Sequence, residues 1–167
     1  MNRLAAIVFT TFCVYLSSAP SFAAGNQYEE TYNVGFVSGN IDGGFEFGEA
    51  AVSGFSLTAR NKKSVLEYVN MSSDAGDLQT AGDTWEADLQ GIYLSLLGEG
   101  QPYMKFKVGS LKQEMIRTES GVVSSELTTI TSYGLGFGFK LGSRILLEVE
   151  VTSLDNDMTL MAATILF

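Results

Sequence analysis

Charged side chains recur at every second position in the later part of this sequence: Lys105 and Lys107, then Lys140 beside alternating glycines, then Glu148 and Glu150. Successive side chains of a β-strand point to opposite faces, so each pair lies on one face of a strand. Two carboxylates on one face could act as a general acid and a general base. We favour ion pairing between the glutamates and the lysines, because buried charges persist in proteins mainly when they are paired.

The sequence lacks the residues on which most hydrolytic sites depend. It contains no histidine, and its single cysteine, Cys13, lies in an apolar run near the N-terminus. Nucleophilic triads of the Ser/His or Cys/His type are therefore excluded, and we expect no enzymatic activity. The acidic clusters at residues 74–77 and 155–157 do not have the spacing of a calcium loop, so we expect no metal site and no cofactor.

The first 23 residues have the organisation of a cleaved export signal. Met1-Asn2-Arg3 is a short basic start, residues 4–16 are uncharged and mostly apolar, and Ser21-Phe22-Ala23 places small residues at both positions that determine cleavage. The apolar run is shorter than the roughly 20 residues that a membrane-spanning helix needs. We therefore predict a signal peptide at residues 1–23 and one domain at residues 24–167.

The composition of the predicted mature chain limits its partners. It keeps nine basic residues and all nineteen acidic ones, a net charge of −10, which argues against nucleic-acid binding. Without cysteine it cannot form disulfides. It also has no apolar run long enough for a transmembrane helix, so it can enter a membrane only as β-strands.

Period-two alternation, bounded by turn residues, divides the mature chain into eight predicted strands. They lie near residues 30–38, 45–59, 64–71, 85–97, 104–117, 133–141, 145–152 and 158–167, with polar loops at 72–84 and 118–125. A tilted transmembrane strand needs about 9 to 11 residues, which these segments can supply. The pattern predicts an all-β fold, an eight-stranded antiparallel up-and-down transmembrane β-barrel.

The predicted strand at residues 133–141 alternates most clearly. One face carries Tyr133, Leu135, Phe137, Phe139 and Leu141, and the other carries Gly134, Gly136, Gly138 and Lys140. Glycines leave room in a narrow lumen for larger neighbours. We therefore predict that the charged and glycine-bearing faces point into the barrel and that the apolar faces point toward lipid. A soluble barrel of lipocalin type, with its apolar face inside, is the alternative.

The predicted connections differ between the two ends of the barrel. With the N-terminus in the periplasm, the inner connections at 60–63, 98–102 and 142–143 are short, and the first carries three basic residues. Two of the outer connections are long, and together the outer ones collect Asp42, Asp74, Asp77, Asp83, Glu119, Asp155 and Asp157. Short periplasmic turns and long outer loops are typical of outer-membrane barrels. Aromatic residues near strand ends fit interfacial girdles, namely Tyr32, Tyr68, Trp85, Tyr103 and Tyr133.

The last third of the sequence resembles a known family. A glycine-rich aromatic strand from Tyr133 to Lys140, a short turn, a Leu-Glu-x-Glu-like strand from Arg144 to Thr152 and a terminal Phe167 are similar to small outer-membrane β-barrels. These are the barrels related to the OmpA transmembrane domain and the opacity-type surface proteins. The resemblance implies that Phe167 is an assembly signal, through which the barrel-assembly machinery recognises the closing strand.

These features predict a monomer in the Gram-negative outer membrane, in contact with lipid and lipopolysaccharide, with a lumen filled by side chains. Lys105, Lys107, Lys140, Glu148 and Glu150 are the luminal charges expected to pair. The predicted role is structural or an interaction at the cell surface, with an extracellular partner that the sequence does not identify. Two alternatives stay open: a narrow channel for solute permeation, and a soluble periplasmic ligand-binding β-barrel.

Overall fold

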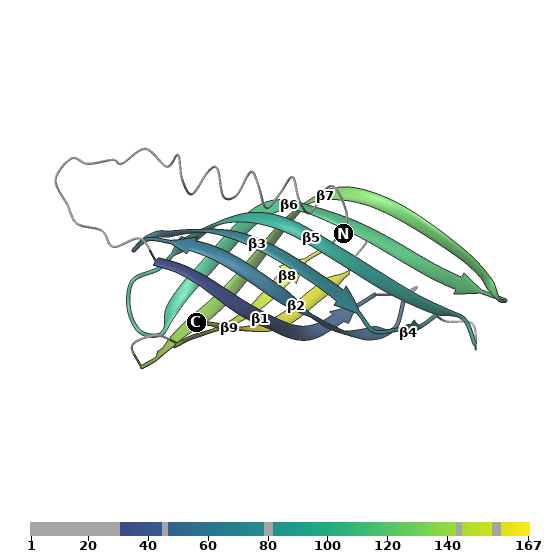
Figure 1. Ribbon diagram of the computed structural model, residues 1–167, viewed down its shortest axis with the longest axis horizontal. Coiled ribbons are helices and arrows are strands. Elements are labelled where there is room, and N and C mark those ends of the chain that lie inside the picture. Colours follow the sequence, from purple (N-terminus) through teal and green to yellow (C-terminus); the bar gives the residue numbers. More distant parts are fainter. Residues whose placement is uncertain (1–30, 45–46, 79–81, 143–144, 155–157) are drawn as a thin grey trace.

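The chain forms a closed antiparallel β-barrel (Figure 1). The computed structural model describes residues 31–44, 47–78, 82–142, 145–154 and 158–167. Its strands are β1 (Thr31–Asp42), β2 (Glu49–Arg60), β3 (Ser64–Ser73), β4 (Gly76–Asp77), β5 (Thr84–Leu97), β6 (Tyr103–Glu119), β7 (Val122–Leu141), β8 (Ile145–Ser153) and β9 (Thr159–Leu166). The predicted signal peptide at residues 1–23 lies outside the described residues. Within the described ranges, no helix is long and apolar enough to cross a bilayer.

Eight of these strands pair with their neighbours along the chain, and the last pairs with the first. β9 lies between β8 and β1, as predicted for the closing strand. β3 pairs directly with β5, whereas β4 adds only two residues beside β5. Every one of these pairings is antiparallel. The predicted eight-stranded up-and-down barrel is confirmed, with β4 as an additional short strand.

The connections separate into two ends of the barrel. We call one the turn end; it holds the β2–β3, β5–β6 and β7–β8 connections together with Phe167. We call the other the hairpin end; it holds β4, the β6–β7 turn and the remaining connections (Figure 1). The described parts of the predicted inner connections lie at the turn end, and those of the predicted outer connections lie at the hairpin end.

A β-hairpin replaces the polar loop predicted at residues 118–125. β6 and β7 pair without a break from Tyr103↔Gly138 to Glu119↔Val122, and only Ser120 and Gly121 join them. Both turn residues have positive φ, 50° and 80°, the backbone of a type I′ hairpin turn. The loop prediction was wrong because strands that face water on both sides are polar throughout, so polarity alone does not mark a loop.

β7 extends well beyond its neighbour on the other side. β8 pairs with β7 only from Tyr133 to Leu141, whereas β7 begins at Val122. Among the described residues, no strand pairs with the second edge of residues 122–132. β5 accompanies β6 as far as Thr84↔Thr118, so β5, β6 and β7 project together, and β7 has the open edge (Figure 1).

Other strand boundaries also differ from the predicted ones. β1 runs to Asp42 instead of Ser38, because Gly39 pairs with both β2 and β9 instead of turning the chain. A Cβ on Gly39 would collide with the backbone of β9, so this glycine permits the close approach of two strands. The predicted loop at 72–84 contains the end of β3 and all of β4, and β2 begins at Glu49 instead of residue 45.

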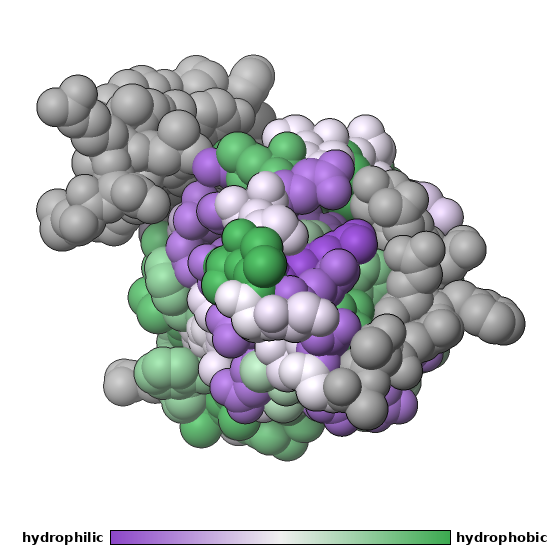
Figure 2. Space-filling view, turned by 90° about the vertical axis from the view of Figure 1, so that its right-hand side faces the viewer, coloured by the Kyte–Doolittle hydropathy of each residue, from purple (hydrophilic) through white to green (hydrophobic). Residues whose placement is uncertain are grey.

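Apolar side chains cover the outside of the barrel. On β7 the outward residues are 41–58% exposed: Tyr133, Leu135, Phe137, Phe139 and Leu141. Similar outward rows run along β1 (Tyr32, Val34, Phe36), β5 (Ile92, Leu94, Leu96) and β6 (Met104, Phe106, Val108). Figure 2 shows hydrophilic side chains over much of the hairpin end and hydrophobic ones around its sides. A lipocalin-like barrel would turn these rows inward, so their orientation favours a membrane-spanning barrel.

The interior near the hairpin end holds an apolar cluster that alternation alone does not predict. Ile41, Trp85, Leu89 and Leu111 are fully buried in it, and Phe47 packs edge-on against Trp85 with ring centroids 5.4 Å apart. Other members are Val37, Val52, Met71, Met115, Leu154, Met158 and Leu160. This cluster also assigns the faces of β5, whose sequence is apolar on both: Trp85 and Leu89 point inward.

Two aromatic residues do not lie in the predicted interfacial girdles. Trp85 and Tyr103 face the lumen and are 0% and 5% exposed, whereas Tyr32 and Tyr133 face outward. Trp85 packs on Phe47, and the Tyr103 hydroxyl donates a hydrogen bond to a luminal carboxylate. Nearness to a strand end therefore does not decide the face; the position of a residue in the inward–outward alternation does.

Candidate functional site

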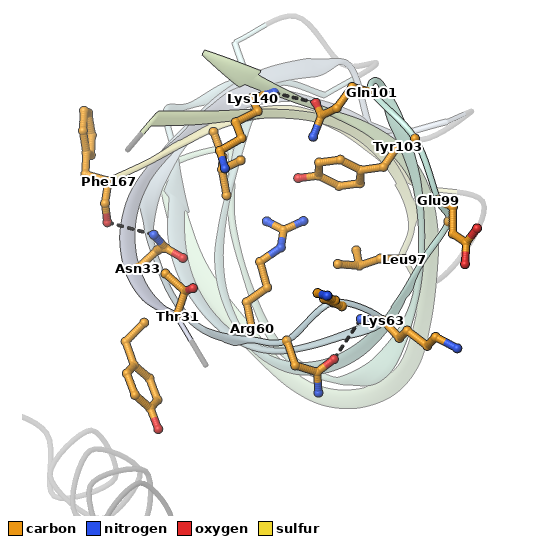
Figure 3. Close-up of a pocket in the computed structure, with 16 residues that line it drawn as sticks. Thr31, Asn33, Arg60, Lys63, Leu97, Glu99, Gln101, Tyr103, Lys140 and Phe167 are labelled. Carbon is orange, nitrogen blue, oxygen red and sulfur yellow. Dashed lines mark hydrogen bonds between the residues drawn. The ribbon is translucent and has the colours of Figure 1, made fainter. Parts of the chain in front are cut away.

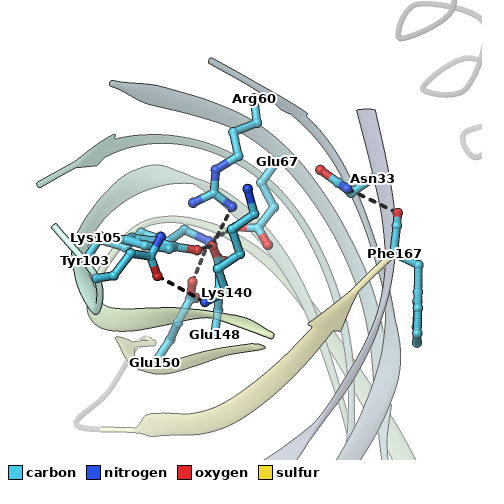
Figure 4. A network of polar contacts seen from close by, with 10 residues as sticks. Asn33, Arg60, Glu67, Tyr103, Lys105, Lys140, Glu148, Glu150 and Phe167 are labelled. Carbon is cyan, nitrogen blue, oxygen red and sulfur yellow. Dashed lines mark hydrogen bonds and ion pairs between the residues drawn. The ribbon is translucent and has the colours of Figure 1, made fainter. Parts of the chain in front are cut away.

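An ammonium group among three carboxylates forms the centre of a polar network inside the barrel (Figure 4). Lys105 Nζ lies 3.0 Å from Glu67 Oε2, 2.7 Å from Glu148 Oε2 and 2.5 Å from Glu150 Oε1. Lys105 belongs to β6, Glu67 to β3 and the other two glutamates to β8. None of these three strands is a neighbour of another in the sheet, so the ion pairs cross the lumen.

Two further cations and a tyrosine complete the network. Arg60 donates from Nη1 to Glu148 Oε1 at 3.1 Å, and the Tyr103 hydroxyl donates to the same oxygen at 2.5 Å. Lys107 pairs with Glu150 Oε2. Three basic side chains therefore face three carboxylates, and the formal charge of the network is zero.

The glycine row of β7 makes room for these side chains. A Cβ on Gly134 would lie 3.0 Å from Lys107 Cε, and a Cβ on Gly136 would lie 2.7 Å from Glu150 Cγ. A Cβ on Gly138 would overlap the Tyr103 ring. The network side chains therefore lie directly against the backbone of β7, as expected for glycines that leave space for larger neighbours.

The structure brings together four of the five charges predicted to be luminal: Lys105, Lys107, Glu148 and Glu150. The fifth, Lys140, stands on the same face of β7 as the glycines but at the turn end, where it is exposed. Its backbone N–H donates to Gln101 Oε1 at 3.2 Å, and no described carboxylate pairs with its ammonium group. The pairing predicted for Lys140 is absent because Lys140 lies two residues nearer the turn end than Gly138, the partner of Tyr103, and so stands outside the network.

Glu67 and Arg60 belong to the network but are not among the predicted luminal charges. Glu67 lies on the opposite face from Leu66 in the third predicted strand, which is the signal that could have identified it. Arg60 belongs to a run of basic residues that indicates a turn, yet it continues the inward row of Ser56 and Thr58 to the last residue of β2.

The carboxylates of this network are held by cations of the chain itself. Single carboxylate oxygens of Glu67, Glu148 and Glu150 lie within 4.8 Å of one another, a spacing at which a metal ion could be bound. Lys105 Nζ pairs with all three, so an ammonium takes that place. The arrangement fits a structural ion network that ties β2, β3, β6 and β8 together across the lumen.

Phe167 fixes the closing strand at the turn end. Its N–H donates to the Val34 carbonyl at 3.0 Å, and its main-chain oxygen accepts a hydrogen bond from Asn33 Nδ2 at 3.2 Å. Its ring lies edge-on to Phe36 with centroids 6.5 Å apart. Phe167 thus joins β9 to β1 through the backbone and through the outer, apolar face.

Comparison with known proteins finds likeness in structure only. No protein-family model matches the sequence, and no curated protein matches it. The N-terminal β-barrel domain of Pseudomonas aeruginosa OprF has a TM-score of 0.62 at 10% identity, over 83% of this chain and 98% of that one. Neisserial surface protein A has a TM-score of 0.58 at 7% identity, over 81% of this chain and 94% of that one.

A third solved structure, Ail, the attachment invasion locus protein of Yersinia pestis, has a TM-score of 0.57 at 12% identity. The match covers 84% of this chain and 97% of that one. Another structure of Ail is a complex with the heparin analogue sucrose octasulfate. At these identities the likeness concerns the fold, a small transmembrane β-barrel, which the family resemblance of the last third of the sequence predicts.

Proposed function

We propose that this chain, which has the fold of small outer-membrane β-barrels, is a monomer in the Gram-negative outer membrane that is closed to solutes and contacts other molecules through a projecting sheet. The observation that carries the proposal is the open edge of β7 at residues 122–132. The proposal includes no catalytic role, because the sequence has no histidine and the luminal carboxylates are held in ion pairs.

Charge and loop length support the orientation. Among the described residues, acids predominate at the hairpin end (Asp42, Asp74, Asp77, Asp83, Glu86, Asp88 and Glu119, with Arg117), whereas bases predominate at the turn end (Arg60, Lys62, Lys63 and Lys140, with Glu99). Periplasmic connections of outer-membrane barrels are short. We therefore assign the turn end to the periplasm and the hairpin end, with its projecting sheet, to the cell exterior.

Two layers in series oppose solute passage through the lumen. Near the turn end, the ion network joins opposite walls through Lys105. Near the hairpin end, Trp85, Leu89 and Leu111 belong to a packed apolar cluster, and an ion crossing it would lose its hydration without compensation. This arrangement supports a filled lumen over the alternative of a narrow channel.

Planar-bilayer recording of the refolded protein tests the closed lumen. We expect no steady conductance from the wild-type chain, and none from E148Q or K107M, because the apolar cluster persists in both variants. Steady conductance steps in the wild type that change with either substitution would favour the narrow channel.

The open edge of β7 offers unpaired backbone N–H and C=O groups, which can bind an extended peptide as an additional strand. Its first residues, Val122 and Val123, are 69% and 66% exposed, and Leu127 is 56% exposed. Glu119 and Glu126 stand beside them, so a segment with basic residues would be favoured electrostatically. The partner class that this surface fits is therefore an extended, basic stretch of polypeptide.

A deletion variant whose β6–β7 hairpin is shorter, but whose strand register is unchanged, tests this contact surface. Deleting residues 116–119 and 122–125 removes four pairs between β6 and β7 and three pairs between β6 and β5. It retains Ser120 and Gly121 and makes Met115↔Glu126 the closing pair. An even number of pairs preserves the alternation of hydrogen-bonded and non-bonded pairs, so the turn should still form. Equal amounts of the full and shortened proteins, refolded in detergent, are compared for binding of a short synthetic peptide of alternating lysine and valine. Weaker binding by the shortened protein supports the proposal, and equal binding contradicts it.

The heparin analogue in the Ail complex supplies a second probe. Sucrose octasulfate is strongly anionic, and the hairpin end of this chain is rich in acidic side chains, among them Asp83, Glu86 and Asp88. We expect no saturable binding of this compound at the hairpin end, because the charges repel. Saturable binding there would contradict recognition of a basic segment and favour an anionic partner.

Contact with lipopolysaccharide is also part of the proposal. Asp88 lies directly opposite Glu114 across β5 and β6, beyond the apolar row that ends at Ile92. Anionic groups of lipopolysaccharide can approach such acids only if divalent cations bridge them. Limited proteolysis of the hairpin-end connections should therefore slow when calcium or magnesium is added to the protein with lipopolysaccharide. No cation-dependent change would count against this contact.

A further inference from the structure

A cavity opens at the turn end of the barrel (Figure 3). Its volume of about 740 Å³ lies within the usual range for small-ligand sites, roughly 300–1,000 Å³. Arg60 and Tyr103 belong both to the cavity lining and to the ion network, so the network forms the floor of the cavity. A ligand in this cavity would therefore meet a fixed polar surface.

Two basic side chains reach into this cavity from different strands. Figure 3 shows the Arg60 guanidinium extending from β2 and the Lys140 side chain extending from β7. Arg60 donates from Nη1 to Glu148, and among the described residues no partner is given for its Nε–H, which is therefore a donor available to a ligand. Lys140 Nζ has no ion pair or hydrogen bond within the described residues. Because the charges of the network already cancel, Lys140 adds a positive charge that nothing in the network balances.

The Arg60 guanidinium is held in position before any ligand arrives. Its Cζ lies 4.6 Å from the centroid of the Tyr103 ring, and its side chain is only 11% exposed. The Tyr103 hydroxyl is itself fixed by Glu148. A rigid guanidinium with a free donor loses little entropy when it binds an oxyanion.

The other cavity residues are suited to a polar ligand. Asn33 is 8% exposed, and its Oδ1 has no hydrogen-bond partner in the described part of the chain. Gln101 uses Oε1 to accept from the Lys140 N–H, which leaves its amide N–H groups as donors. Glu99 also borders the cavity, but its side chain points away from it (Figure 3). Arg60, Lys140 and the Gln101 amide therefore offer hydrogen-bond donors to an anion, whereas the free Asn33 Oδ1 can only accept.

We propose that this cavity binds a phosphate group, held between Arg60 and Lys140. A phosphate presents acceptor oxygens in several directions, so it can accept from a guanidinium and from an ammonium on another strand at the same time. The phosphate is either that of a lipid headgroup at the adjacent membrane surface or a soluble phosphate. The site does not depend on the proposed role of the β6–β7 hairpin.

Phosphate titration followed by NMR tests the site. The full barrel is refolded in an uncharged maltoside detergent, and inorganic phosphate is added at constant ionic strength. We expect saturable shifts of the Arg60 Nε–H and of the Lys140 backbone amide. K140Q should weaken binding by about tenfold, the usual effect of losing one charge-assisted hydrogen bond.

K63Q is the matched control, because Lys63 borders the same cavity and carries the same charge, yet its side chain points away (Figure 3). It should change phosphate affinity by less than about twofold, as expected for an exposed charge at a distance. Equal weakening by K140Q and K63Q would overturn the proposal, because it would indicate only a general attraction of anions. Shifts that rise linearly without saturation would also overturn it.

Lipid nanodiscs distinguish the two sources of phosphate. Phosphate affinity is measured in the maltoside detergent, which contains no phosphate, and in nanodiscs that contain phosphatidylglycerol. If lipid headgroups occupy the cavity, the apparent affinity of the wild type and of K63Q should be lower in the nanodiscs, but not that of K140Q. Equal affinity in both environments supports the site and assigns it to soluble phosphate.

Discussion

Lys105 Nζ lies 2.7 Å from Glu148 Oε2 across the lumen, and both side chains are only 1% exposed. Because β6 and β8 are not neighbours in the sheet, this ion pair connects opposite parts of the wall instead of adding to a strand pairing. The attraction between two buried charges is largely offset by the loss of their hydration. Loss of one partner, in contrast, leaves the other charge buried without compensation.

Replacing Lys105 with methionine should therefore destabilise the barrel strongly. K105M leaves Glu67, Glu148 and Glu150 close together without their shared ammonium, and we expect a loss of about 3–5 kcal/mol in the free energy of unfolding. Urea unfolding in detergent, followed by fluorescence of the single tryptophan, measures the change. K112M, on the same strand but outside the network, should change stability by less than about 0.5 kcal/mol. A loss as small for K105M as for K112M would contradict the structural role of the network.

Removing the ammonium should also turn the three carboxylates into a cation site. Their oxygens lie within 4.8 Å of one another, so calcium could occupy the place vacated in K105A. A ligand that binds only the folded state stabilises it, by about 2.7 kcal/mol at 100 times its dissociation constant. Calcium should therefore raise the urea midpoint of K105A and leave that of the wild type unchanged. A midpoint of K105A that does not respond to calcium would show that the carboxylates cannot converge on an ion.

The contact between Gly138 and the Tyr103 ring predicts a large effect of one added methyl group. In G138A the new Cβ would overlap the ring, so Tyr103 must move and its hydrogen bond to Glu148 is lost. We expect a loss of about 1–3 kcal/mol in unfolding free energy. G98A is the control, since its Cβ would lie at an ordinary 3.5 Å from the nearest atom of Met104. Equal stabilities of the two variants would mean that Tyr103 has free space around it.

The fold and most of the ion network follow from the inward–outward alternation of each strand, because alternation determines the face of every residue. It does not determine depth along the lumen. Lys105 and Lys140 both lie on luminal faces, yet only Lys105 reaches the glutamates, because depth depends on how neighbouring strands are staggered. Arg60 joins the network for the same reason, although a basic run surrounds it.

The apolar cluster and the projecting hairpin could not be predicted from alternation. A strand that is apolar on both faces, such as β5 around Ile92 and Tyr93, has no contrast from which to assign a face. The hairpin has the opposite composition, since serine and threonine dominate both of its faces around Thr128 and Thr129. Its best signal is the Ser120-Gly121 turn, and a two-residue turn is recognisable only once the flanking residues are accepted as strands.

The last prediction concerns Phe167 and separates assembly from stability. Deleting this residue removes the N–H that donates to Val34 and the ring that packs on Phe36. If Phe167 is an assembly signal, the deletion should lower the amount of barrel in the outer membrane several-fold, while the same chain still refolds in detergent. Electrophoresis of boiled and unboiled membrane samples measures the folded fraction.

F36A is the matched control for this deletion, because it removes the same ring contact from the β1 side and leaves the chain end intact. If packing alone matters, the deletion and F36A should lower membrane levels equally, and both should weaken the refolded barrel. If the strand end is recognised during assembly, only the deletion should lower membrane levels. Wild-type membrane levels of the deletion variant would show that Phe167 has no special role, and that the pairing of β9 with β1 and β8 is sufficient for assembly.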